Sequence, residues 1–219
     1  MTIEEFREKA KNEDWVPGWD AIESVFKKLY PEQEPHHFAS KIEKRAMFGG
    51  PEYIDGYSLY KSPNGYTHIV TFGMTELYAE EESLGGEYSR WGYEMTMKLP
   101  EDDPEQCVWA VNLLGNLGRY TYTKESWFEP GHFMSNLGES IKTDVDSCLT
   151  AIMVVPDTEA EGIDTIYGRV DFLQFVGITT EEYEMLKADP SKAPLLAEAM
   201  RKDNPHLVTD INRTRSYKV

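Results

Sequence analysis

The stretch WGYEMTMKL, residues 91–99, carries the most regular pattern in the chain. Large apolar side chains occupy its odd-numbered positions, and small, polar or charged side chains occupy the even-numbered ones. Since neighbouring side chains of a β-strand point to opposite faces of the sheet, this alternation predicts a strand with one face on a hydrophobic core. The side chains expected to face the core are Trp91, Tyr93, Met95 and Met97. Glu94 and Lys98 are expected to face solvent or a polar groove.

Further strands are predicted on both sides of this stretch. Residues 54–61 and 66–72 also read as strands, and SPNG at 62–65 between them is a strong turn signal. SCLTAIMVV at 147–155 and RVDFLQFVGI at 169–178 are almost continuously apolar, as in strands that are covered on both faces. His68 lies among apolar neighbours and is expected to be a hydrogen-bonded core histidine.

Helices are predicted between and around these strands. Residues 19–29 repeat apolar side chains with helical spacing, and Pro31 ends the pattern. A second helix is predicted from about 105 to 120, where Gly115 and Gly118 suit a helix backbone that lies close against a sheet. Capping-box sequences at 2–5 and 179–182 and an apolar stretch at 194–200 predict three more helices. No linker or repeat divides the 219 residues, so one α/β domain is the simplest interpretation.

The formal net charge of −17 makes nucleic acid an unsuitable partner, because phosphate binding needs a basic patch. The acidic runs at 80–82, 101–103 and 157–164 are either solvated loops or a surface that steers a basic protein partner. The N-terminal sequence lacks the pattern of a signal peptide, and no apolar run is long enough to span a membrane. Cys107 and Cys148 are too few for a disulfide framework and are predicted to be buried thiols, so we expect a cytoplasmic protein.

His36 and His37 invite the hypothesis of a metal or acid–base site. The alternation from residue 36 to 48 predicts a half-buried strand, in which the two rings point to opposite faces; a helical interpretation remains open. No further Cys, His or Asp follows at ligand spacing. We therefore predict that this pair binds no metal.

The chain also lacks the common sequence motifs of nucleotide binding, metalloprotease and serine hydrolase chemistry. The glycines of LLGNLGRY fall within a predicted helix rather than after a strand, so they do not form a phosphate-binding loop. We predict no catalytic residues and no cofactor.

Several stretches, in order, resemble the Suppressor of fused family in its bacterial single-domain form. The matching stretches are PGWDAI, LYPEQEPHHF, FGGPEYIDGYSLY, HIVTFGMTELY, WGYEMTMKL, LGNLGRYTYTKESWFEPGH and GRVDFLQFVGITTEEYEML. The resemblance implies an α/β sandwich of a mixed, largely antiparallel sheet packed with helices. It places a Suppressor of fused-like domain at residues 17–219, preceded by a helical extension at 1–16. It covers the first lobe of the two-lobed animal protein, which closes on a peptide by strand addition.

The resemblance implies a non-catalytic, intracellular protein-binding role. Bacterial members are associated with toxin–immunity loci, so the partner is expected to be a toxin domain, and the acidity of this chain fits a basic one. A stress or housekeeping role without a toxin partner remains open. The oligomeric state is left open.

The predicted partner surface lies in the aromatic stretch YTYTKESWFEPGHFM, residues 120–134. GRYTY keeps the aromatic Tyr120 that family members present near the partner site. EPGH places His132 where the animal pattern has an acid followed by histidine. The predicted partner-binding residues are Tyr120, Trp127, Phe128 and His132. The alternative is a small-molecule-binding protein or a hydrolase that uses His132 with nearby carboxylates.

Overall fold

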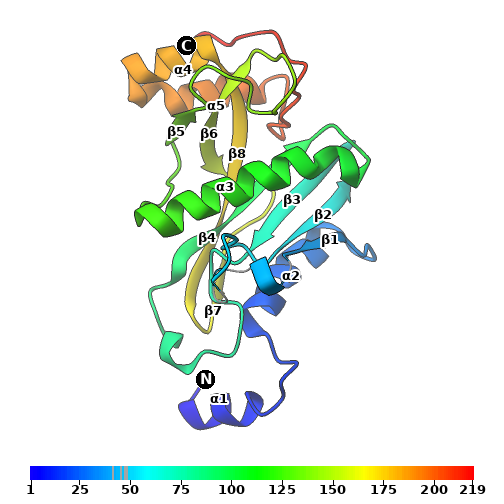
Figure 1. The fold of residues 1–219 in the computed structure, drawn as a ribbon, viewed down its shortest axis with the longest axis vertical. Coiled ribbons are helices and arrows are strands. Elements are labelled where there is room, and N and C mark those ends of the chain that lie inside the picture. The colour runs from blue at the N-terminus through cyan, green and yellow to red at the C-terminus, as the bar shows by residue number, and fades with distance from the viewer. Residues whose placement is uncertain (41, 45, 47–48) are drawn as a thin grey trace.

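The computed structural model describes residues 1–40, 42–44, 46 and 49–219 and is built on one sheet (Figure 1). The described strands are β1 (His36–Ala39), β2 (Gly56–Ser62), β3 (Tyr66–Phe72), β4 (Tyr88–Leu99), β5 (Phe133–Ser135), β6 (Leu149–Pro156), β7 (Ile163–Thr165) and β8 (Gly168–Thr179). Their order is β1-β2-β3-β4-β8-β6-β5, and β7 pairs with β8 beside this path. Within the described strands, β4 and β8 pair in parallel and the other pairs are antiparallel. The predicted mixed, largely antiparallel sheet is confirmed.

The described helices are α1 (Ile3–Lys9), α2 (Pro17–Leu29), α3 (Val108–Lys124), α4 (Thr180–Ala188) and α5 (Ala193–Arg201). Two of them, α1 and α4, begin at side-chain caps, and α2 and α5 begin with a proline in the first turn. Short 3-10 turns occur at η1 (Ile42–Lys44), η3 (Glu81–Ser83), η4 (Pro104–Cys107) and η5 (Pro190–Lys192). Both predicted capping boxes are formed, with Thr2 and Glu5 at α1 and with Thr179 and Glu182 at α4.

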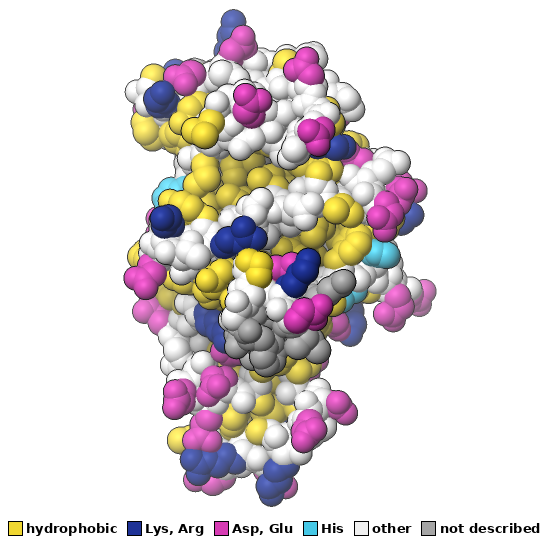
Figure 2. Space-filling model, in the orientation of Figure 1, with side chains coloured by type: hydrophobic (Ala, Val, Ile, Leu, Met, Phe, Trp, Pro, Cys, Tyr) yellow, Lys and Arg dark blue, Asp and Glu magenta, His cyan; other side chains and the backbone are white. Residues whose placement is uncertain are grey.

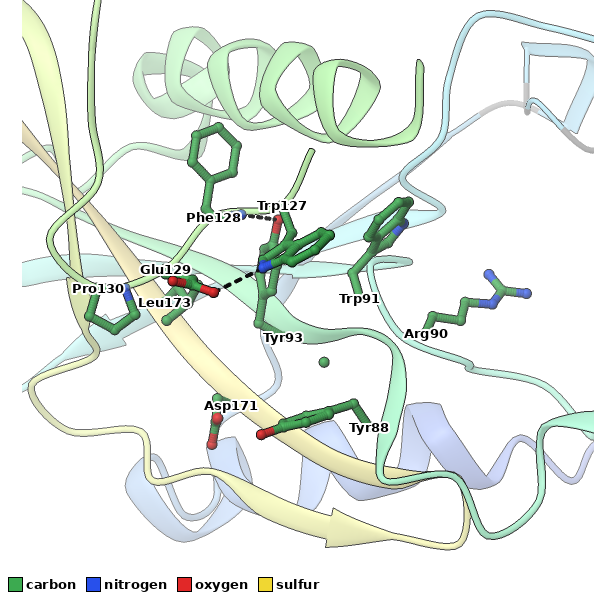
Figure 3. A pocket seen from close by; sticks show the side chains of 11 residues that line it. Tyr88, Arg90, Trp91, Tyr93, Trp127, Phe128, Glu129, Pro130, Asp171 and Leu173 are labelled. Atoms are coloured by element: carbon green, nitrogen blue, oxygen red, sulfur yellow. Dashed lines mark hydrogen bonds between the residues drawn. The ribbon is translucent and has the colours of Figure 1, made fainter. Parts of the chain in front are cut away.

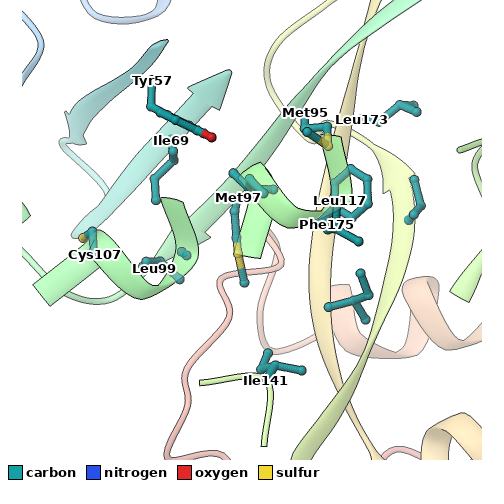
Figure 4. Packing of buried hydrophobic residues seen from close by; sticks show 14 of the residues in the cluster. Tyr57, Ile69, Met95, Met97, Leu99, Cys107, Leu117, Ile141, Leu173 and Phe175 are labelled. Atoms are coloured by element: carbon teal, nitrogen blue, oxygen red, sulfur yellow. The ribbon is translucent and has the colours of Figure 1, made fainter. Parts of the chain in front are cut away.

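One face of the sheet is covered by α3, which crosses the strands in Figure 1. Its buried side chains pack on the odd-numbered residues of β4, including Met95 and Met97, in the cluster of Figure 4. Gly115 and Gly118 permit this approach, because a Cβ atom there would lie 2.7 Å from the Tyr57 hydroxyl and 2.8 Å from Ile54 respectively. The expectation of a helix pressed closely on the sheet is confirmed.

The opposite face is covered in two places. Side chains of α2 pack on β2, β3 and the start of β8, in a cluster that includes Phe26, Tyr60 and Phe172. Side chains of α4 and α5 pack on β6 and the end of β8, in a cluster that includes Met153 and Leu196. The molecule therefore has helices on both faces of one sheet, and polar residues lie between the two apolar clusters of this second face.

The face of β4 that was expected to meet solvent or a polar groove is closed off from water. Tyr93, Met95 and Met97 lie in the core as predicted, and Trp91 is partly exposed. Glu94 and Lys98 are fully buried, so their expected exposure to solvent is wrong. Burial is possible because each charge is met by polar groups supplied from other parts of the chain.

The Glu94 carboxylate accepts hydrogen bonds from the turn after β3. The backbone N–H groups of Gly73, Met74 and Thr75 donate to it over 3.1, 3.3 and 3.0 Å, and the hydroxyls of Thr71 and Thr75 donate over 2.6 and 2.7 Å. The carboxylate thus fixes the shape of this turn.

The Lys98 ammonium group lies 3.1 Å from Asp157 and 2.8 Å from Glu159. Asp157 also accepts from His68 Nε2 over 2.9 Å, and Tyr30 meets His68 Nδ1 over 2.8 Å. The prediction that His68 is a hydrogen-bonded core histidine is confirmed. Asp157 and Glu159 of the acidic run at 157–164 therefore pair with the buried Lys98. The interpretation of this run as a solvated loop is wrong for these two residues.

Two further predictions need correction. Cys107 is buried, but Cys148 is exposed because it precedes β6 by one residue. The strand predicted over 36–48 ends at Ala39, and Ile42–Lys44 forms a 3-10 turn; residues 41, 45, 47 and 48 lie outside the described part of the chain. Within β1, His36 packs on Phe38 and His37 packs on Trp19, so the two rings point to different faces.

Candidate partner-binding surface

The site begins with an irregularity in β4. This strand advances from Tyr88 to Tyr93 while its parallel partner β8 advances only from Arg169 to Asp171. The extra residues form a bulge in which Arg90 and Gly92 have φ values of 47° and 80°. Glycine suits this conformation, and a Cβ atom at residue 92 would lie 2.9 Å from the Tyr88 ring. The bulge turns the Tyr88 side chain out of the sheet.

A cavity of about 530 Å³ lies beside the bulge (Figure 3). Its sides are the bulge itself, the loop after α3 and the side chains of β8. The lining residues are Tyr88, Arg90, Trp91, Gly92, Tyr93, Trp127, Phe128, Glu129, Pro130, Asp171 and Leu173. Tyr88 and Trp127 are each 54% exposed, so two large aromatic rings stand at the surface of one cavity.

The loop after α3 is held in place by hydrogen bonds to the core. The backbone N–H of Phe128 donates to the Tyr93 hydroxyl over 3.3 Å, and that hydroxyl lies 3.3 Å from Thr121 Oγ1. The indole N–H of Trp127 donates to Glu129 Oε1 over 3.0 Å. These contacts join the loop to the core at Phe128 and link the Trp127 indole to Glu129.

The charged side chains around the cavity differ in how close their partner of opposite charge lies. Arg90 points away from the space in Figure 3 and pairs with Glu76 at 2.7 Å. Asp171 accepts from Arg169 Nε over 2.8 Å, and Glu129 receives the Trp127 indole. The cation nearest to Glu129 in the described structure is His132, whose Nε2 lies 3.9 Å from Oε2 and is charged only when protonated. The cavity therefore presents carboxylate oxygens beside aromatic rings.

The four partner-binding residues predicted from the sequence lie in different surroundings from one another. Tyr120 is on α3, 37% exposed, with its ring 6.0 Å from that of Phe128. Phe128 is 7% exposed and packs edge-on against Phe175 at 5.2 Å, so its ring belongs to the core. Trp127 lines the cavity, and His132 lies at the surface after the loop, with its Nδ1 accepting from the backbone N–H of Glu129 over 3.2 Å.

The loop leads directly into an edge strand. Gly131 and His132 bond to the backbone of Val154 over 2.8 Å, and β5 follows at Phe133–Ser135. β5 pairs with β6 on one side and ends the sheet on the other. An edge strand is able to accept a further strand from another chain. Tyr120, Trp127, His132 and β5 together form what we call the loop-edge surface.

Apolar side chains are also visible at the surface on the face that carries α3. Figure 2 shows hydrophobic side chains in a band over and beside α3, with acidic side chains toward both ends of the molecule. Leu137, which follows β5, is 95% exposed.

Tyr88 and Asp171 were missed by the sequence reasoning. The available signal was Gly92, a glycine inside an otherwise regular strand pattern, which often marks a bulge.

The described residues form no helix with the length and hydrophobicity needed to cross a bilayer. They also contain no group of three His, Cys, Asp or Glu side chains arranged to hold a metal ion.

Comparison with known proteins identifies the family. The family model described as Suppressor of fused protein (SUFU) matches residues 50–214. This chain belongs to the Suppressor of fused family. The human Suppressor of fused homolog is 28% identical over 211 residues, which cover 90% of this chain and 43% of the human protein. The chain thus spans less than half the length of this curated relative.

Solved structures support the same family. A chain of the Sufu–Fu complex crystal structure matches with a TM-score of 0.80 at 25% identity, over 92% of both chains. A SUFU homolog from Neisseria gonorrhoeae matches with a TM-score of 0.60 at 15% identity, over 92% of this chain and 98% of that one, and it supports the fold alone.

Proposed function

We propose that this Suppressor of fused-like chain is a non-catalytic protein-binding domain, and that it binds its partner through the loop-edge surface. The observation that carries the proposal is the exposure of Tyr120 and Trp127, at the end of α3 and in the loop that leads into β5, the last strand of the sheet that the structure describes. Exposed aromatic anchors next to an edge strand are typical of surfaces that bind an extended peptide. A relative with the same fold is found in a complex, the Sufu–Fu complex, which supports this reading.

The specific role we propose is that of an immunity protein that neutralises a basic toxin domain inside the cell. The net charge of −17 supports a basic partner, since complementary charge speeds association and selects against acidic proteins. The alternative hydrolase function would need His132 as an acid or base. In the part of the chain that is described, the support for it is a surface contact between His132 and Glu129.

The partner surface is tested by capture from the native lysate followed by mass spectrometry. Tyr120→Ala and Trp127→Ala should each reduce recovery of the same partner at least about tenfold, because anchor residues carry most of an interface's binding energy. Leu195→Ala is the matched control, since Leu195 is also a large exposed hydrophobic residue but lies on α5. Circular dichroism and thermal melting show whether each variant is folded.

Equal recovery by all three folded variants would contradict the loop-edge surface. The immunity role has a separate test, in which the chain is co-expressed with the partner recovered by capture. Restored growth with the wild type, and its loss with Trp127→Ala, is the expected result. Growth arrest that the wild type fails to relieve would contradict that role.

A further inference from the structure

The cavity between the β4 bulge and the loop after α3 combines two features that favour a cation. The Tyr88 and Trp127 rings are exposed at its surface, and aromatic faces attract cationic groups. Figure 3 shows the carboxylates of Glu129, from the loop after α3, and of Asp171, from β8, at the border of the same space. Each ring lies near one of the carboxylates. The bulge places the Tyr88 ring near Asp171 in Figure 3, and the Trp127 indole bonds to Glu129.

The fixed cations near the cavity are already engaged. Arg90 is turned away toward Glu76. Arg169 is shared between Asp171 at 2.8 Å and the exposed Asp164 at 3.4 Å. A neighbouring hollow, which shares Pro130, Asp171 and Leu173 with the cavity, adds the carboxylate of Glu161. The region around the cavity therefore has more described carboxylates than cations to compensate them.

We propose that this cavity receives an arginine side chain of the protein partner. The proposal rests on the proposed protein-binding function and names the chemistry that one part of the partner must supply. A guanidinium group suits the site better than an ammonium group, because its flat face stacks on Tyr88 or Trp127 while its edge donates to a carboxylate. The apolar floor formed by Tyr93 and Leu173 accommodates the methylene part of the side chain.

Arginine binding is measured with a blocked tripeptide, N-acetyl-Gly-Arg-Gly-amide, by two-dimensional NMR of the indole N–H signals. The Trp127 signal is assigned with Trp127→Phe. We expect this signal to shift and saturate with a dissociation constant on the order of 1 mM. Matched peptides replace arginine by citrulline, lysine or norleucine. Citrulline, which has nearly the same shape without the charge, should bind about tenfold more weakly.

Variants test the walls of the cavity. Glu129→Gln and Asp171→Asn should each weaken arginine-peptide binding severalfold, and Tyr88→Leu should also weaken it. Glu181→Gln removes an exposed carboxylate on α4, away from the cavity, and should leave binding unchanged. Free L-arginine should bind more weakly than the blocked peptide, because its own carboxylate is repelled by the acidic rim.

The proposal is overturned if citrulline or norleucine binds as tightly as arginine. It is also overturned if the Trp127 shift fails to saturate or is unaffected by both carboxylate variants. These outcomes are independent of partner capture. Arginine-peptide binding together with unchanged capture by both Tyr120→Ala and Trp127→Ala would reject the loop-edge surface and the partner as the source of the arginine, whereas loss of capture without arginine-peptide binding would reject the pocket alone.

Discussion

Lys98 has its ammonium group inside the protein, between Asp157 and Glu159. Burial alone would raise the pKa of the Asp157 carboxyl, but His68 and Lys98 beside it hold that pKa well below its usual range. The Asp157 carboxyl is therefore charged in the folded protein, where it contacts the Lys98 ammonium group and the His68 ring. Removing one partner of a buried ion pair leaves the other charge unsolvated, which is far more costly than losing a surface pair.

The Lys98→Met variant should lose about 3–5 kcal/mol of unfolding free energy for this reason. Lys61→Met is the matched control, because Lys61 pairs with Asp102 at an exposed position and should contribute less than about 1 kcal/mol. Urea denaturation measures both. Adding Asp157→Asn to Lys98→Met should recover part of the loss, since asparagine carries no charge. Similar midpoints for the two lysine variants would show that the internal pair contributes no more than the surface pair.

Glu94 is buried, and among the described residues its hydrogen bonds come from backbone N–H groups and threonine hydroxyls rather than from a cation. Burial raises the pKa of Glu94 to about 7, although the hydrogen bonds from Thr71, Thr75 and Gly73 oppose this change. A carboxyl whose pKa is higher in the folded protein than in the unfolded chain favours folding while it is protonated. That contribution is fully present below the ordinary value of 4.5 and is lost as the pH rises through about 7.

The wild type should accordingly lose about 3 kcal/mol relative to Glu94→Gln between pH 4.5 and pH 8. Chemical denaturation of both proteins across this range measures the difference, because the other titrating groups are common to both. A difference that stays constant with pH would mean that Glu94 has the same pKa folded and unfolded.

The C-terminal segment after α5 acts as an additional element on the second face of the sheet. Gln174 Nε2 donates to the carbonyls of His206 and Leu207 over 2.9 and 3.0 Å, and the N–H of Thr209 donates to the Lys98 carbonyl over 2.7 Å. Arg213 then reaches the fully buried Glu182 of α4 with two hydrogen bonds, over 2.7 and 2.9 Å. The segment thus joins α4 to the sheet.

Arg213 and Arg215 are a natural pair for testing this element. Arg213→Leu leaves the Glu182 carboxylate buried without its cation and should cost about 3–5 kcal/mol. Arg215→Leu removes an exposed pair with Asp203 and should cost less than about 1 kcal/mol. Thermal and urea unfolding of both variants measure the difference. Equal effects would show that Arg213 acts as an ordinary surface residue.

The elements themselves were predictable because their signals are local. The Thr179–Glu182 capping box and the turn at 62–65 each lie within four residues, and each forms as predicted. It was also predictable that the odd-numbered side chains of β4 face the core. What lies over its even-numbered face was not, because the groups that meet Lys98 come from Asp157, Glu159 and the C-terminal segment.

The candidate site was likewise predictable only where its signal lies within one stretch of sequence. The loop that carries Trp127 was found from its density of aromatic residues in one stretch of sequence. Tyr88 and Asp171 were not found, because the parallel pairing of β4 with β8 brings them together from distant parts of the chain. Phe128 has the same composition signal as Trp127 but packs against Phe175. Which side of a loop meets the core is decided by packing that the local sequence does not encode.

At the scale of the whole molecule, the acidic residues that produce the net negative charge have more than one role. Asp157 and Glu159 pair with internal cations, while other acidic groups lie at the surface toward both ends of the face shown in Figure 2. The apolar band over and beside α3 lies between these ends. Figure 2 also shows Lys and Arg side chains beside this band, so the charge of this face is mixed rather than uniformly acidic.

The central pair of strands, β4 and β8, also affects how the chain is made. Residue 93 leaves the ribosome long before residue 171, so the strand that completes the middle of the sheet is synthesised late. Until then β4 has a free edge, although α3, which covers its apolar side chains, is synthesised before β8. Such edges are templates for pairing with other chains, and contacts between distant residues form slowly. Unfinished chains, rather than the folded protein, are thus the form in which this molecule is exposed to aggregation and most depends on chaperones.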